Sequence, residues 1–221
     1  MLIKITFHII LLLFSTSIIN AQYFDSVEKE SERILVSLSD IDSANPTDLT
    51  ELKILLSSDF ENDVSESITP INQQSIDSLR NHLTEFESEL KNISTDSAFV
   101  LFNEWYLHFQ NIFYEYSKEK FFSSDKRKIL FFSTSMSCYC ALKMCRNQTV
   151  ELLKFISEST DEYDYWIIDS YWFNELQIEY ETLFAPSVIV FDGNDQVLYK
   201  IEYDEKMIEQ LTAFLSGSDK I

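Results

Sequence analysis

Glycine is almost absent from this chain of 221 residues, in which only Gly193 and Gly217 occur. P-loops and dinucleotide-binding loops need several glycines at fixed spacing, because their backbone approaches phosphate groups closely. We therefore exclude nucleotide-binding enzymes of these two classes. Histidine is also scarce: there are 3, and His8 lies in an apolar N-terminal segment. A histidine-based metal site or a Ser/His/Asp triad thus has few residues to draw on.

Basic residues are few as well, with 17 Lys and Arg against 37 Asp and Glu, which gives a net charge of −20. A surface that follows nucleic-acid phosphates needs clustered positive charge, so we expect no nucleic-acid partner. The chain is nevertheless 45% hydrophobic and 14% aromatic. Disordered proteins lack such a composition, and we expect this chain to fold around a substantial core.

The first 21 residues have the pattern of a secretory signal peptide. Lys4 lies near the start, an apolar run covers residues 9–14, and the small residue Ala21 stands at the expected cut. Cleavage after Ala21 would leave a secreted or periplasmic chain that begins at Gln22. An uncleaved membrane anchor is the alternative, but the run is shorter than the roughly 20 residues that a span needs. No later stretch approaches that length, so we expect no stable membrane span after leader removal.

Residues 22–122 are predicted to form an all-α N-terminal domain. Apolar side chains recur at spacings of three and four, which is typical of amphipathic helices. One predicted helix carries Ile76, Leu79, Leu83, Phe86 and Leu90. Another, from residue 96 to about 116, carries Phe99, Phe102, Tyr106, Phe109 and Phe113. For this aromatic stripe we favour a packed core over a ligand groove.

Residues 126–221 show a different pattern, in which short apolar runs alternate with helical segments. Strands are predicted at 128–132, 165–168, 186–191 and 196–201, and helices after the cysteines, at 172–183 and at 207–215. The order is β-α-β-α-β-β-α. Alternation of this kind favours parallel strands joined by helices, while the turn around Gly193 predicts an antiparallel hairpin.

All three cysteines of the chain, Cys138, Cys140 and Cys145, lie where the first predicted strand meets its helix. A thiolate at a helix N-terminus is stabilised by unpaired N–H groups and by the helix dipole. Cys138 is therefore the best candidate nucleophile. Cys140 could resolve its disulfide through a strained, easily reduced bridge. Cys145 could also do so, but it lies about 10 Å further along the helix, so the first turn would have to unwind.

The C-terminal pattern resembles the thioredoxin-like family over about residues 126–216. Four features carry the resemblance: the strand before the cysteines, the helix after them, Ala185-Pro186-Ser187 at the start of a strand, and the Asp192-Gly193 hairpin. The resemblance implies an α/β thioredoxin-like domain with a central mixed sheet and flanking helices. It also implies a cis proline at Pro186, with Ala185, Pro186 and Tyr139 as substrate-binding residues.

The activity implied by this resemblance is that of an exported thiol/disulfide oxidoreductase with catalytic residues Cys138, Cys140 and Cys145. It would act on extracytoplasmic protein thiols or disulfides, need no organic cofactor, and be recycled by a membrane or exported redox partner. The family usually shows Trp-Cys-x-x-Cys, whereas this chain has Ser137 before a Cys-x-Cys-x4-Cys motif.

Two other interpretations of the cysteine cluster stay open. Three thiols beside Met136 and Met144 form a soft ligand set suited to Cu(I), which would make the protein a copper-binding protein or chaperone. Alternatively, one disulfide and a buried thiol would be structural, and the protein would be a redox-inactive interaction protein.

Overall fold

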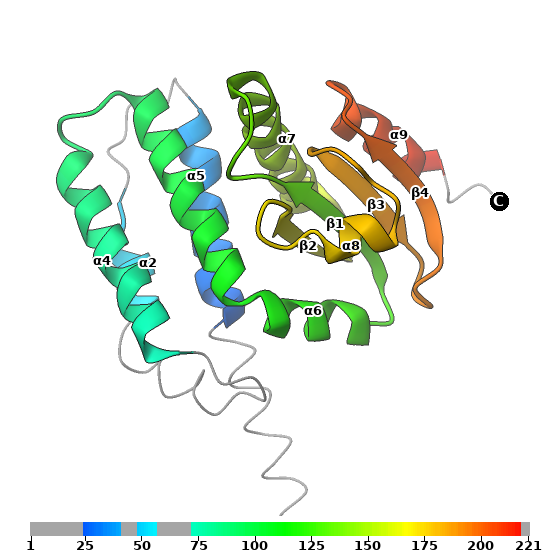
Figure 1. The fold of residues 1–221 in the computed structure, drawn as a ribbon, viewed down its shortest axis with the longest axis horizontal. Helices are drawn as coiled ribbons and strands as arrows, with labels where there is room; N and C mark the ends of the chain where they lie inside the picture. The colour runs from blue at the N-terminus through cyan, green and yellow to red at the C-terminus, as the bar shows by residue number, and fades with distance from the viewer. Residues whose placement is uncertain (1–23, 41–47, 57–71, 218–221) are drawn as a thin grey trace, which may run out of the picture. The chain divides into compact units, whose positions relative to one another are not determined.

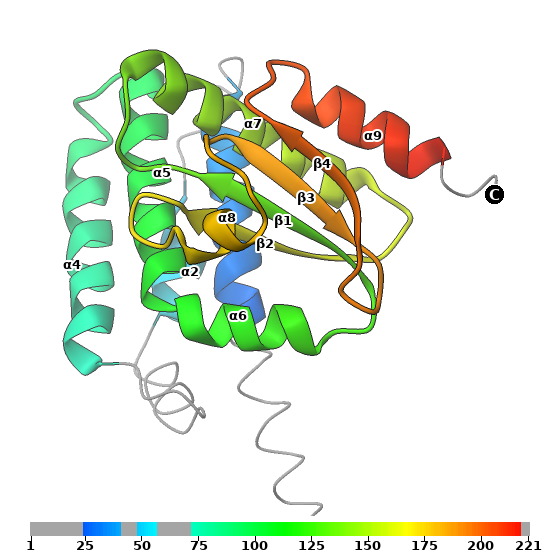
Figure 2. The ribbon, with the colours of Figure 1, turned by 45° about the vertical axis from the view of Figure 1, so that its right-hand side comes forward.

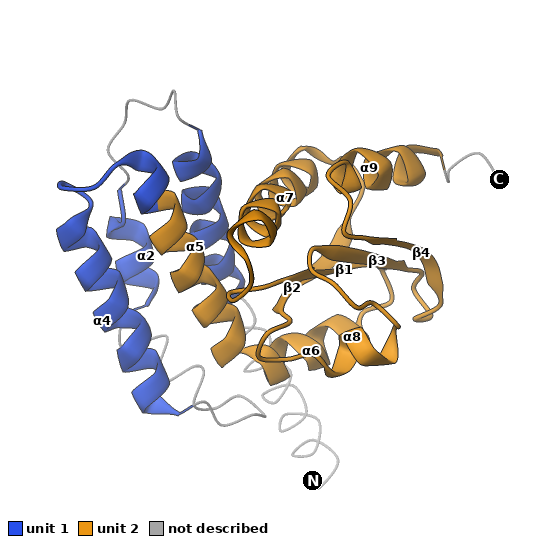
Figure 3. Cartoon of the chain, turned by 45° about the horizontal axis from the view of Figure 1, so that its top comes forward, with its two compact units in different colours: residues 1–98 blue, residues 99–221 orange. Residues whose placement is uncertain are grey.

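The computed structural model describes residues 24–40, 48–56 and 72–217. The expected leader with its cut after Ala21, and the prolines at 46 and 70, lie outside these residues. The chain divides into two compact units, residues 1–98 and 99–221 (Figure 3). No helix in the described part of the chain combines the length and the apolar character that crossing a membrane requires.

The described residues of the first unit are largely helical. They form a helix over 24–39, α2 (Thr50–Leu55) and α4 (Gln73–Glu89) (Figure 1). The predicted apolar stripe of α4 is buried from Ile76 to Phe86, and the Asn72 side chain caps the helix by accepting from the Gln74 N–H at 3.0 Å. Lys53 pairs with Glu87 at 2.7 Å and thereby links α2 to α4.

The helix predicted over residues 96–116 is in fact two helices, α5 (Thr95–Ile112) and α6 (Tyr114–Ser123). Most of the predicted aromatic stripe is buried, with Phe99 half-buried. Trp105 stacks with Phe102 and Phe109, at ring-centroid distances of 5.4 and 6.0 Å. Phe113 leaves helical geometry, and α6 turns away beneath the sheet (Figure 2). The turn lets Tyr114 and Phe121 pack against Trp166 of the sheet, which a continued α5 would not allow.

The second unit contains a four-stranded mixed sheet with flanking helices, in the predicted element order. Its elements are β1 (Arg127–Ser133), α7 (Tyr139–Glu158), β2 (Tyr163–Asp169), α8 (Glu175–Glu179), β3 (Ser187–Phe191), β4 (Val197–Glu202) and α9 (Met207–Gly217). The strand order is β2-β1-β3-β4. β1 is parallel to β2, as the alternation predicts, and β3 is antiparallel to both β1 and β4.

Helices cover both faces of this sheet (Figure 3). On one face, Leu130 and Phe132 of β1 join a cluster with Tyr114 and Phe121 of α6 and Leu176 of α8. Side chains alternate along a strand, so the residues between them point to the face covered by α7 and α9. Both faces of β1 are therefore buried, which explains why its sequence is a continuous apolar run.

The helix predicted over residues 172–183 is wrong in extent, because only α8 forms. Its end has a left-handed residue, Glu181, with φ of 54°. The N–H groups of Glu181 and Thr182 bond back to the carbonyls of Ile178 and Gln177, which is the Schellman arrangement. Glycine usually occupies this left-handed position. Because Glu181 stands there instead, the sequence gives no signal for the end of α8.

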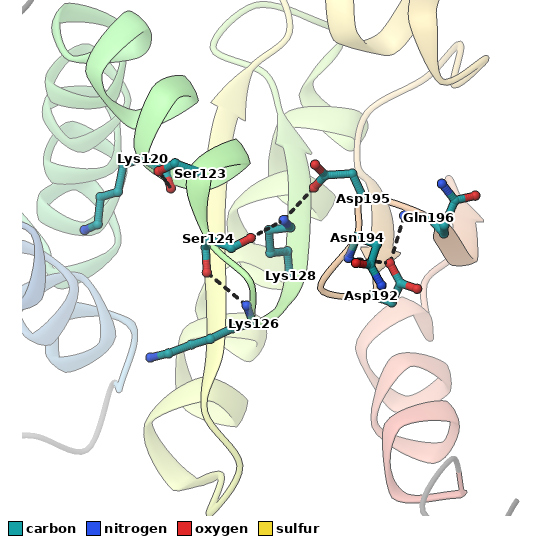
Figure 4. A network of polar contacts seen from close by, with 9 residues as sticks. All are labelled: Lys120, Ser123, Ser124, Lys126, Lys128, Asp192, Asn194, Asp195 and Gln196. Carbon is teal, nitrogen blue, oxygen red and sulfur yellow. Dashed lines mark hydrogen bonds and ion pairs between the residues drawn. The ribbon is translucent and has the colours of Figure 1, made fainter.

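The predicted hairpin turn joins β3 to β4, and Asp192 organises it (Figure 4). Its Oδ1 accepts from the N–H groups of Asn194 and Gln196 at 2.8 and 2.9 Å. A side chain at Gly193 could not fit, because its Cβ would lie 2.1 Å from the carbonyl oxygen of Asp125. Gly193 thus allows the turn to pack closely against the segment that leads into β1.

Candidate functional site: a thiol pair at one edge of the sheet

The chain topology brings four connecting segments to one edge of the sheet. β1 and β2 are parallel, so the segments that follow them leave from the same edge. β3 begins at this edge, where Ser187 is paired with Phe132, and β4 ends there, where Glu202 is paired with Ser187. The cysteine segment, the segment after β2, the segment before Pro186 and the end of β4 therefore meet.

Cys138 is the N-cap residue of α7, and its carbonyl accepts the helical bond from the Leu142 N–H at 3.0 Å. Its exposed thiol lies beside that of Cys140, with the two Sγ atoms 2.8 Å apart. A hydrogen bond from the Cys140 thiol, aided by the Ala141 N–H, lowers the pKa of Cys138. The same bond raises the pKa of Cys140. The opposite directions of these two pKa shifts favour Cys138 as the thiolate and Cys140 as its hydrogen-bond donor.

Cys145 lies on α7 too, but its side chain is fully buried. Burial raises the pKa of its thiol to about 12. The structure thus brings together two of the three predicted catalytic cysteines and places the third in the core. All three are free thiols.

The five residues of the copper interpretation differ in exposure. Met136 is exposed, Met144 is half-buried on α7, and Cys145 is buried. Within the described ranges, no three or more Cys, His, Asp or Glu side chains gather in a way that could hold a metal ion. The Cys138 and Cys140 sulfurs lie 2.8 Å apart.

The Ala185-Pro186 bond is cis, which confirms the conformation expected at this position. Pro186 is buried immediately before β3, Ala185 is half-buried, and the Pro186 carbonyl accepts from the Tyr203 N–H at 2.8 Å. Tyr139, the third predicted substrate-binding residue, lies between the two thiols in sequence and is 75% exposed.

Asp169 is a site residue that the sequence did not reveal. Its fully buried carboxylate accepts from the N–H groups of Ser135 and Tyr171 at 3.0 and 3.1 Å, and from Asn111 at 3.3 Å. It therefore holds the cysteine segment against the segment after β2. An acidic residue that ends an apolar strand is the available signal, but it is weak in a chain with 37 acidic residues.

Tyr203 at the end of β4 is a second such residue. Its φ is 49°, and its ring lies 6.1 Å from that of Phe184. Desolvation and then the charges of Cys140 and Cys138 raise the pKa of its phenol. No sequence pattern links residue 203 to the cysteines, because the strand pairing alone brings them together.

No protein-family model and no curated protein sequence matches this chain. Among the solved structures that match is a crystal structure described as a designed protein, with a TM-score of 0.38 and 17% sequence identity. The match covers 48% of this chain and 87% of the designed protein.

Proposed function

We propose that the protein is an exported thioredoxin-like thiol/disulfide oxidoreductase that acts on extracytoplasmic protein thiols or disulfides. The observation that carries this proposal is the contact between the exposed Cys138 and Cys140 sulfurs at the start of α7. The strand order, the strand-to-helix position of Cys138 and the place of Pro186 before β3 support the thioredoxin-like assignment. An all-α N-terminal domain and a cleaved leader belong to the same proposal.

Written from the reduced pair, the proposed reaction transfers two electrons from the thiol pair to a substrate disulfide, and the same steps in reverse let the oxidised pair act on substrate thiols. The Cys138 thiolate attacks one substrate sulfur, the substrate S–S bond breaks, and one substrate sulfur leaves as a thiolate. Cys140 then gives up its proton, and its thiolate attacks the Cys138 sulfur. This breaks the mixed disulfide, releases the second substrate thiolate and leaves a Cys138–Cys140 disulfide. The two substrate thiolates each take up a proton, and an external dithiol regenerates the pair.

The different environments of the two thiols fit these roles. A nucleophile needs a thiolate near neutral pH, and hydrogen bonds to the Cys138 sulfur favour that form. A resolving thiol need ionise only after the mixed disulfide has formed. At that moment Cys138 no longer carries a negative charge, so the interaction that raises the pKa of Cys140 is removed. Cys145 is buried and keeps its proton, so we assign the resolving role to Cys140.

The test is an exchange assay with the chain expressed from Gln22 onward. Its substrates are oxidised glutathione and a disulfide-bonded peptide. We expect Cys138→Ser to abolish exchange, Cys140→Ser to accumulate a mixed disulfide visible by mass spectrometry, and Cys145→Ser to retain exchange. The last variant is the matched control, because it removes a sulfur from the same helix.

Two results would overturn the proposal. Exchange that is absent from the wild-type chain, together with stoichiometric Cu(I) bound by the thiols, would establish the copper-binding interpretation instead. A disulfide that resists dithiothreitol in a chain without exchange activity would establish the structural one.

A further inference from the structure

The edge of the sheet that carries the thiol pair also carries most of the exposed large apolar side chains. Seven of the eleven such side chains among the described residues belong to the segments that meet there. They are Met136, Tyr139, Tyr171, Trp172, Leu183, Phe184 and Tyr203. Two pairs of these side chains are in ring contact, Tyr171 with Trp172 and Phe184 with Tyr203. Exposed apolar side chains that gather in one region of a domain often mark an interaction site.

Leu183 and Phe184 stand out, because their backbone is firmly held while their side chains are 77% and 60% exposed. The carboxylate oxygen Oε1 of Glu202 accepts from the N–H groups of both residues, at 2.6 Å for Phe184. A loose loop would not require a side chain of a neighbouring strand to bind two consecutive amides. The exposure therefore belongs to a positioned segment.

A second residue of β4 reinforces this arrangement. Lys200 donates to the carbonyls of Tyr180 and Glu181 at 3.0 and 3.3 Å. Residues 200 and 202 share one face of the strand, since side chains alternate along it. β4 thus holds the segment that precedes Pro186 at both of its ends.

This segment lies at the same edge of the sheet as the reactive sulfurs, because it leads into β3, whose first residue, Ser187, is paired with Phe132 at the end of β1. The Phe184 ring packs with Tyr203, whose pKa is raised by desolvation and then by the charges of Cys140 and Cys138. The Tyr203 N–H bonds to the Pro186 carbonyl and so fixes the end of β4 to the residue after Ala185. The exposed side chains of Leu183 and Phe184 thus lie at the edge of the sheet that a substrate must approach to reach Cys138.

We propose that Leu183 and Phe184 determine substrate specificity by packing against an apolar side chain close to the cysteine of an extended polypeptide, with Glu202 as the positioning residue. This inference rests on the oxidoreductase function proposed above. Burial of the two exposed side chains on binding favours such a substrate, whereas a polar side chain there would lose water without gaining a partner.

The experiment compares two disulfide peptides of equal length and charge that differ only in Leu or Ser two residues before the reactive cysteine. We expect the wild-type chain to show a kcat/KM roughly tenfold higher for the Leu peptide, the factor that burial of one apolar side chain typically supplies. Leu183→Ser and Phe184→Ser should each reduce this preference severalfold. Val197→Ser is the control, because Val197 is also exposed but lies at the start of β4, at the opposite edge of the sheet.

Glu202 is tested by two variants. Glu202→Ala removes the acceptor for both amides and should raise KM for the Leu peptide severalfold with little change in kcat. Glu202→Gln keeps a side-chain oxygen that accepts these bonds, so it should restore most of the wild-type KM. A purely structural role would lower the thermal midpoint in both variants without this difference in KM.

The outcomes separate this inference from the proposed function. A wild-type chain that exchanges with oxidised glutathione and with both peptides equally would overturn the specificity inference alone. So would a Leu preference that survives in both serine variants. A wild-type chain that exchanges with neither peptides nor oxidised glutathione would overturn the proposed function, and the inference with it.

Discussion

The ammonium group of Lys128, a fully buried side chain at the start of β1, is paired with the carboxylate of Asp195 in the β3–β4 turn at 2.5 Å (Figure 4). It also donates to the Ser124 carbonyl at 2.7 Å. A buried charge is costly unless it is paired, so this contact ties the hairpin to the beginning of the sheet.

Asp195→Asn removes the negative charge of this pair but keeps a residue that tolerates the left-handed conformation at position 195, where φ is 62°. We expect a loss of about 1–2 kcal/mol in the free energy of unfolding, because the buried ammonium then lacks its anion and keeps only the Ser124 carbonyl. Urea denaturation measures it. Glu162→Gln is the control, since Glu162 pairs with Lys126 on the surface and should matter little. Equal stability of both variants would show that the buried pair contributes nothing net.

Cys140→Ala removes the main hydrogen bond to the Cys138 sulfur. We expect the pKa of Cys138 to rise, because the donor that lowers it is lost. At neutral pH the thiolate fraction falls, so alkylation of Cys138 by iodoacetamide should slow severalfold, with its pH profile moved to higher pH. Cys145→Ala is the control and should leave the profile in place. An unchanged profile in Cys140→Ala would contradict the proposed hydrogen bond.

Cys145 should escape alkylation in the folded protein and react only after denaturation. Its folded-state pKa of about 12 lies above the ordinary thiol value near 9.0. As pH rises, this thiol ionises in the unfolded chain before it ionises in the folded protein. Its contribution to the free energy of unfolding is therefore complete below about pH 9 and is lost as the pH rises toward 12. Unfolding free energies measured between pH 8.5 and 10.5 should therefore fall more steeply for the wild-type chain than for Cys145→Ala. Parallel curves would contradict this.

Glu181→Gly should stabilise the protein. Glu181 has a positive φ at the end of α8, and a side chain in this conformation costs about 1–2 kcal/mol. Glycine removes that cost, but it loses more backbone entropy on folding, which offsets part of the gain. We expect a net gain of about 0.5 kcal/mol and a higher thermal midpoint. Glu179→Gly, within α8, should instead destabilise. A gain at both positions would show that the effect is not conformational.

The strands were predicted within about two residues because each is a short apolar run bounded by polar residues. The sequence did not predict the helix break at Phe113 or the early end of α8. Neither position has a glycine or proline, and both depend on packing against the sheet. Tertiary contacts decide such boundaries more than local preference does.

The sequence identified Cys138 and Cys140 because they are neighbours in the chain. It did not show that Cys145, unlike the other two cysteines, is buried. A usable signal was present, because Ala141, Cys145 and Leu152 share a buried face of α7 at helical spacing. The contacts of Glu202 and Tyr203 with the segment before Pro186 depend on the register of β3 and β4, which no local pattern specifies.

Asp169 links the segment that follows β1 to the segment that follows β2. One of its oxygens binds the backbone of both Ser135 and Tyr171, while the Ser170 N–H and hydroxyl bond to the Ser133 carbonyl. Displacement of either segment must stretch or break bonds to the other. A partner that displaces Trp172 would therefore have to strain bonds that also hold the segment leading into α7, which links binding at Trp172 to the position of Cys138.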